Sequence, residues 1–195
     1  MTKFRSGFVN IIGFPNVGKS TLLNKMLGEK LSIVTHKAQT TRQRISGILN
    51  GKDYQIVFSD TPGILDPKYE LQKVMGNEVR QAMEDADILL YMVEAGDKTE
   101  KHEAHLKKIK GLGIPFLLII NKIDLSDQEN LEKTTDQWRE LVDEKLILPM
   151  SALHNFNLPN LLEFIINNLK EHEPFFPKDM ITDKSERFIA SEIIR

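Results

Sequence analysis

The 195-residue chain carries 26 lysines and arginines against 28 aspartates and glutamates, and 41% of its residues are hydrophobic. This composition is typical of a folded globular protein and excludes a disordered or collagen-like chain. The formal net charge of −2 excludes a surface that binds polyanions through its overall charge. The chain contains no cysteine, which excludes disulfides, a thiol nucleophile and thiolate metal sites.

The two most apolar runs, residues 87–93 and 115–120, are far shorter than the roughly 18–20 residues that a membrane span needs. The first residues include only a brief apolar run that ends in a glycine, which does not resemble a secretory signal. We therefore expect a cytoplasmic protein. The length favours one domain with a single buried core, followed by a tail.

Short apolar runs alternate with segments of helical period along the chain. A strand is expected over 7–12 and a helix over 21–27 that ends at Gly28. Strands over 44–49 and 54–59 flank Asn50-Gly51, a dipeptide that tolerates the positive φ angles of a tight hairpin turn. Further helices are expected over 71–86, 103–111, 130–144 and 160–170, and further strands over 88–93, 116–120 and 146–150.

This alternation predicts an α/β fold. We expect a three-layer sandwich whose six-stranded sheet is mostly parallel, with one antiparallel edge strand and helices on both faces. In such a sheet ligands bind at the carboxyl ends of the strands.

The run GFPNVGKS over residues 13–20 matches the P-loop pattern and lies between a predicted strand and a predicted helix. In this motif consecutive backbone N–H groups hold phosphate oxygens beside the positive end of a helix. Lys19 is then expected to reach the β and γ phosphates, and the Ser20 hydroxyl to ligate Mg²⁺. The alternative is a glycine-rich turn with a lysine that reaches solvent.

Three further motifs follow predicted strands. Asp60-Thr-Pro-Gly63 can hold Mg²⁺ through Asp60, by way of a water, and sense the γ phosphate through the Gly63 amide. The same four residues also occur in ordinary turns.

The run Asn121-Lys-Ile-Asp124 and the later Ser151-Ala152 also stand at strand ends. Here the Asp124 carboxylate can accept hydrogen bonds from N1–H and the exocyclic amino group of guanine, Asn121 can contact the other edge of the base, and an amide near Ala152 can donate to O6. Adenine lacks this pattern, so a buried site of this kind can reject it. The alternative is a plain loop in which Asp124 caps a helix.

Taken in this order, the four motifs resemble those of the translation-factor-related GTPases. The run Lys37-Ala-Gln-Thr-Thr-Arg42 narrows the resemblance to the Era family of bacterial ribosome-assembly GTPases, over essentially the whole chain. The resemblance implies a P-loop NTPase fold of the small-GTPase type that binds GTP or GDP with Mg²⁺. It implies nucleotide-binding residues at Gly13, Phe14, Pro15, Asn16, Val17, Gly18, Lys19, Ser20, Thr21, Asp60, Thr61, Pro62, Gly63, Asn121, Lys122, Asp124, Ser151, Ala152 and Leu153.

The resemblance also implies catalytic roles for Lys19 and for Thr41, which would reach Mg²⁺ together with Ser20 and Asp60. Ile64 follows Gly63 where Ras-like GTPases have a water-orienting glutamine, so slow intrinsic turnover is expected. Among relatives, an asparagine at the place of Asn16 accompanies a K⁺ ion between the phosphates, with carbonyls near Thr35 and Lys37. The alternative is that Asn16 only braces the loop.

The domain organisation implied by the family is a GTPase domain over 1–172, a linker over 173–184 with two prolines, and over 185–195 the first helix of a truncated KH-type RNA-binding domain. A short tail helix on the main domain is the alternative. The intact protein is expected to bind 16S rRNA and the 30S subunit, with weak or absent RNA binding by this chain, no DNA binding, and a cytoplasmic location that includes peripheral association with the inner membrane. Other readings are a GTPase of tRNA modification or of the large subunit, a P-loop kinase or ATPase, and a non-catalytic nucleotide-binding module.

Overall fold

The computed structural model describes residues 3–28, 45–61, 63–64 and 70–182. Within these ranges the chain forms one six-stranded sheet with the order β2-β3-β1-β4-β5-β6. Its strands are β1 (Arg5–Gly13), β2 (Ile45–Asn50), β3 (Tyr54–Asp60), β4 (Ile88–Glu94), β5 (Phe116–Asn121) and β6 (Ile147–Pro149). Edge strand β2 is antiparallel to β3, and every other pairing is parallel. The predicted sheet is therefore confirmed, including its antiparallel edge.

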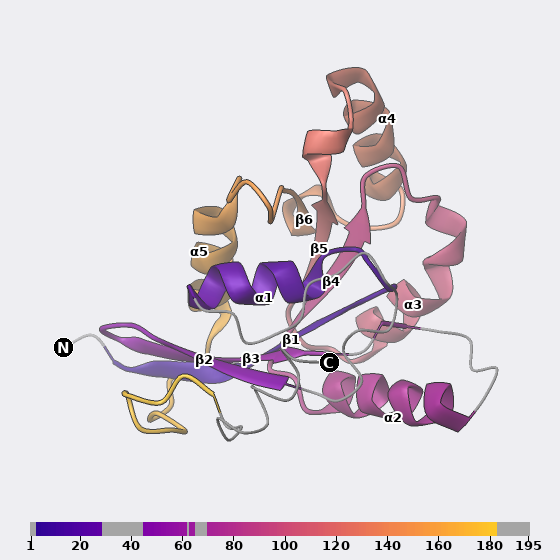
Figure 1. Ribbon diagram of the computed structural model, residues 1–195. Coiled ribbons are helices and arrows are strands. Elements are labelled where there is room, and N and C mark those ends of the chain that lie inside the picture. Colours follow the sequence, from indigo (N-terminus) through magenta and orange to yellow (C-terminus); the bar gives the residue numbers. More distant parts are fainter. Residues whose placement is uncertain (1–2, 29–44, 62, 65–69, 183–195) are drawn as a thin grey trace, which may run out of the picture.

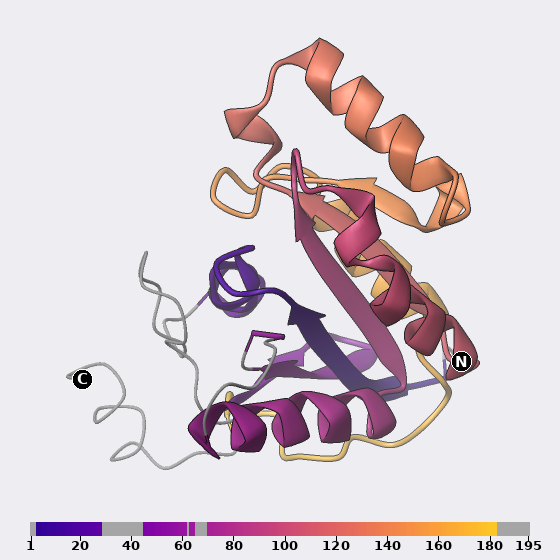
Figure 2. The same cartoon turned by 90° about the vertical axis from the view of Figure 1, so that its right-hand side faces the viewer.

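Helices cover both faces of this sheet (Figures 1 and 2). They are α1 (Lys19–Leu27), α2 (Glu70–Glu84), α3 (Glu103–Gly111), α4 (Gln128–Arg139) and α5 (Leu158–Asn168), with single 3₁₀ turns η1 (Thr99–Lys101), η2 (Ile123–Leu125) and η3 (Glu144–Leu146). No helix in the described ranges is long and apolar enough to cross a membrane.

The core has two halves because successive side chains of a strand point to opposite faces. In β4, for example, Leu90 packs into the layer beneath α1 and α5, and Tyr91 into the layer beneath α2, α3 and α4. Strands β4 and β5 are buried along almost their whole length, as strands between two helix layers must be. The predicted three-layer sandwich is thus confirmed.

The hairpin between β2 and β3 differs from the prediction. The Gly51 amide donates to the Tyr54 carbonyl at 2.9 Å, so Lys52 and Asp53 form the turn. Neither Asn50 nor Gly51 has a positive φ. A Cβ on Gly51 would lie 2.3 Å from the Tyr54 ring, so the glycine is needed for this close approach and not for a left-handed backbone.

Helix α4 ends at Arg139 and not at residue 144. Asp143 then caps a separate turn, because its carboxylate accepts the Lys145 amide at 2.9 Å. This local hydrogen bond competes with continued helix, which a count of apolar positions does not detect.

Residues 173–182, which we call the strap, contain no helix or strand but lie along β2, β3 and β1 (yellow in Figure 1). The fully buried Gln55 of β3 makes four hydrogen bonds: its Oε1 accepts the amides of Phe175 and Phe176, and its Nε2 donates to the Phe176 carbonyl and to Asn50 Oδ1. The Ile48 amide of β2 donates to the Ile181 carbonyl at 2.8 Å. The strap is therefore held against the edge of the sheet. The helix expected over 185–195 lies outside the described residues.

Candidate nucleotide-binding site

The P-loop connects β1 to α1 at the carboxyl edge of the sheet, as predicted. Close contacts require both of its glycines. A Cβ on Gly13 would lie 2.2 Å from the Met92 carbonyl oxygen, and one on Gly18 would lie 2.3 Å from Asn121 Nδ2. Gly18 has a φ of 107° and is the N-cap of α1, with no side chain to cap that helix end, and the first turn of α1 contains no acidic residue. A helix N-terminus built in this way suits an anion.

Lys19 is buried within this loop. Its Nζ donates to the carbonyl oxygens of Gly13 at 3.0 Å and Phe14 at 2.8 Å. Burial lowers the pKa of Lys19 from 10.5 to about 8, although the negative charge of Asp60 opposes this shift. A buried ammonium is costly, and a phosphate beside it would supply the opposite charge.

The aspartate loop at the end of β3 packs directly on the P-loop. Ser20 Oγ donates to Asp60 Oδ2 at 2.6 Å, and the Ile64 amide donates to the Gly13 carbonyl at 3.0 Å. Gly63 lies so close to Pro15 that a Cβ would be 2.7 Å from the Pro15 nitrogen. The structure therefore brings together a hydroxyl and a carboxylate, both hard oxygen donors of the kind that Mg²⁺ prefers.

The third part of the site is organised by Asn121, the last residue of β5. Its Nδ2 donates to the Val17 carbonyl at 2.8 Å, and its Oδ1 accepts the Ala152 amide at 2.9 Å. Asn121 thus joins the P-loop to the loop after β6. Asn121 and the Ala152 amide bond to each other, and the expected contacts of Asn121 and of an amide near Ala152 with the base stay predictions.

Asp124 lies on the rim beside this junction. Ser151 Oγ donates to Asp124 Oδ1 at 2.5 Å, and His154 Nε2 lies 3.8 Å from Asp124 Oδ2. Ser151 therefore orients the carboxylate expected to bind guanine, a role that the sequence did not reveal. Leu153 is 60% exposed on the same rim.

Two contacts around the site were not predicted from the sequence. Lys122 has a left-handed backbone (φ 63°) and donates from Nζ to Glu94 Oε2 at 2.8 Å. Glu94 is the register partner of Asn121, the residue before Lys122, so the pairing of β4 with β5 brings the two charges together. His102, to which the sequence motifs assign no role, is fully buried against Phe14 of the P-loop.

Several predicted residues lie outside the described ranges. These are Thr35, the run from Lys37 to Arg42 with Thr41, and Pro62.

A mostly parallel α/β sheet with a P-loop, an aspartate loop and the loops at Asn121–Asp124 and Ser151–Ala152 at one edge defines a P-loop GTPase fold. Residues 8–122 match the family described as "50S ribosome-binding GTPase". The chain belongs to the Era family of GTPases, since curated relatives named GTPase Era are 44% identical in Clostridium acetobutylicum and 47% identical in Syntrophus aciditrophicus, in each case over 98% of this chain. The chain spans 65% and 63% of the length of these two relatives.

Solved structures agree with this assignment. A crystal structure of Era in complex with MgGDPNP and nucleotides 1506–1542 of 16S ribosomal RNA has a TM-score of 0.91 at 41% identity, covering 98% of this chain and 66% of that one. A variant of Aquifex aeolicus Era bound to GDP and AlF4⁻ gives the same values.

Proposed function

We propose that this chain binds GTP and GDP, with the phosphates at the P-loop and the guanine ring at Asp124. The observation that carries the proposal is the double hydrogen bond of Asn121, which ties Val17 of the P-loop to Ala152 of the rim. The phosphate-binding and base-binding loops are thereby held at a fixed separation before a nucleotide arrives. Preorganisation of this kind lowers the cost of binding.

Calorimetry tests this proposal directly. The wild-type chain is expected to bind GDP and GTP and to reject ATP. Asp124→Asn should weaken GTP binding by about a hundredfold or more and strengthen binding of the xanthine nucleotide, because an amide donates a hydrogen bond where the carboxylate accepts one. Asp127→Asn is a matched control, since Asp127 caps α4 through its carboxylate and asparagine is an equally good cap. Binding of ATP as tight as that of GTP would favour the P-loop kinase or ATPase alternative.

We further propose a Mg²⁺-dependent site. Ser20 Oγ and Asp60, together with Thr41, would hold the ion, Asp60 by way of a water. When bound, Mg²⁺ neutralises charge on the phosphate oxygens. The 2.6 Å contact between Ser20 Oγ and Asp60 Oδ2 supports this placement. Removal of Mg²⁺ with a chelator should weaken GTP binding.

Hydrolysis of GTP to GDP and phosphate is proposed to be slow. Lys19 and the loop amides can stabilise charge on the γ phosphate, with Thr41 as a second catalytic residue. Ile64, however, packs its side chain against the apolar layer beneath α2, α3 and α4 and has no group that orients a water. Turnover of tens per second without an added factor would contradict this proposal, and nucleotide binding without any phosphate release would favour a non-catalytic module.

K⁺ stimulation of hydrolysis is a separate proposal. Asn16 is exposed at the apex of the P-loop with a left-handed backbone (φ 64°), where a side-chain oxygen can reach an ion beside the phosphates. Equal hydrolysis rates in matched KCl and NaCl would overturn it.

For the whole protein we propose a role in assembly of the small ribosomal subunit, because the Era relative described above was crystallised with a 16S rRNA segment. The description of the matching family instead names the 50S subunit, which keeps a large-subunit role as the second candidate. Co-purification of the full-length protein with ribosomal particles separates the two. We also propose a cytoplasmic location with peripheral membrane association, which cell fractionation tests.

A further inference from the structure

A histidine without solvent exposure lies between the P-loop and α4. His102 precedes α3, and its Nδ1 is 2.7 Å from the Tyr91 hydroxyl oxygen. Its Nε2 lies 3.4 Å from Asp97 Oδ2. Because a carboxylate can only accept, the imidazole proton is placed on Nε2 facing Asp97, and Nδ1 accepts from the Tyr91 hydroxyl. Nδ1 therefore has a hydrogen-bond partner, whereas Nε2 makes no hydrogen bond in the described structure and faces the Asp97 carboxylate at 3.4 Å.

Asp97 is itself firmly held. It accepts the Glu94 amide at 3.1 Å and a proton of the Lys101 ammonium at 2.5 Å. Burial alone would raise the pKa of Asp97, but the nearby His102 ring and the hydrogen bond from the Lys101 ammonium lower it to about 2. The carboxylate is therefore ionised at neutral pH and gives His102 a fixed anionic partner.

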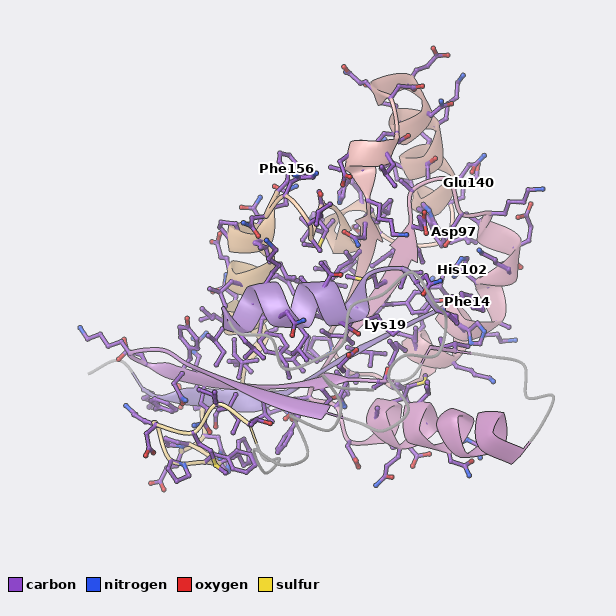
Figure 3. The ribbon with its side chains drawn as sticks, in the orientation of Figure 1. Phe14, Lys19, Asp97, His102, Glu140 and Phe156 are labelled. Atoms are coloured by element: carbon purple, nitrogen blue, oxygen red, sulfur yellow. The ribbon has the colours of Figure 1, made fainter. Side chains whose placement is uncertain are left out.

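The His102 ring packs edge-on against Phe14, with ring centroids 5.0 Å apart and an interplanar angle of 84°. Phe14 also receives the ring of His105 at 5.5 Å and the ammonium of Lys101 at 5.4 Å. Figure 3 shows Phe14, His102 and Asp97 beside one another, with Lys19 further along the same P-loop as Phe14. Phe14 is the second residue of the P-loop, and its carbonyl accepts the Lys19 ammonium.

We propose that His102 is a positioning residue for the nucleotide phosphates, an inference that rests on the nucleotide binding proposed above. Fixed by Tyr91 and Asp97, its ring holds the ring of Phe14 and thereby the Phe14 carbonyl that orients Lys19. The first carbonyl partner of Lys19, on Gly13, belongs to β1 and is held by the sheet. The second lies beyond the strand, so it needs a tertiary contact to stay in place.

A residue that only filled space would not need two polar nitrogens in a buried site. Burying them is unfavourable unless they have polar partners, and the Nδ1 hydrogen bond together with the Asp97 charge beside Nε2 fixes the plane of the ring. An edge-on aromatic contact depends on that plane. The hydrogen bond between Nδ1 and the Tyr91 hydroxyl, with the Asp97 carboxylate 3.4 Å from Nε2, therefore determines where Phe14 packs.

A double-mutant cycle tests the proposal with His102→Gln, Phe14→Leu and the double variant. Each single change should weaken GDP binding by about tenfold, because small displacements of a binding group are costly. The double variant should bind no worse than either single variant, since both changes remove the same contact. In GTP hydrolysis KM should rise and kcat should fall as well, because Lys19 both binds the phosphates and stabilises charge on the γ phosphate.

Trp138→Phe is the matched control. Trp138 of α4 packs on His102, with ring centroids 5.1 Å apart, and among the described residues it has no ring contact with the P-loop. This substitution should lower Tm and leave the GDP dissociation constant unchanged. Tyr91→Phe removes only one hydroxyl, and should weaken GDP binding in the same direction if His102→Gln does not fold. The inference is overturned if the His102 and Tyr91 variants lose Tm alone, or if the His102 and Phe14 effects multiply. Failure of nucleotide binding in the wild-type chain would instead refute the proposed function.

Discussion

Replacing Gln55 with leucine should release the strap from the sheet. Gln55 is fully buried, and its side chain makes four hydrogen bonds of 2.7–2.9 Å, three of them to Phe175 and Phe176. A hydrogen bond contributes about 1 kcal/mol net, which sets a ceiling of about 4 kcal/mol. Leucine fills the site without a polar group, and the freed strap amides can return to water because most of the strap is exposed. We therefore expect a loss of about 2–3 kcal/mol in the free energy of unfolding.

Thermal denaturation and limited proteolysis measure this effect. For a domain of this size the expected fall in Tm is about 5–10 °C. Trypsin should cut after Lys178 at least about tenfold faster, because cleavage follows the population of the opened strap. Gln128→Leu is the matched control, since Gln128 is exposed on α4 and bonds only Glu132 at 3.1 Å among the contacts recorded. If Gln55→Leu behaves like this control in both assays, the strap is not held by Gln55.

Two further predictions concern the nucleotide site itself. Burial lowers the pKa of Lys19 from 10.5 to about 8. A phosphate that restores the charge of Lys19 should therefore cause proton uptake on GDP binding near pH 8.5, and the affinity for GDP should fall as pH rises above 8. Calorimetry in buffers of different ionisation enthalpy detects the uptake, and its absence would contradict the shift. Gly18→Ala should weaken GDP binding by about a hundredfold or more, because its Cβ would lie 2.3 Å from Asn121 Nδ2. Gly96→Ala is the control, since Gly96 has a φ of 88° with open space around it, and equal effects in the two variants would show that backbone strain alone is responsible.

The sequence predicted most of the sheet because burial between two helix layers produces uninterrupted apolar runs, as at residues 88–93 and 116–120. It also predicted the P-loop, since that motif depends on residue types at a short, fixed spacing. The hairpin turn was misplaced by two residues. Asn50-Gly51 is a strong local signal for positive φ, but the contact of Gly51 with the Tyr54 ring decided the geometry.

Local pattern predicted the P-loop, the aspartate loop and the loops at Asn121–Asp124 and Ser151–Ala152, and the order in which they follow the strands. Only the tertiary structure decided how distant segments are joined. Asn121 bonds Val17 of the P-loop, 104 residues away, and Gln55 bonds Phe176 of the strap, 121 residues away. The tertiary structure also placed His102 against Phe14. Periodicity and backbone preference act over a few neighbouring residues, whereas the partner of a buried polar side chain is chosen by the packing of distant elements.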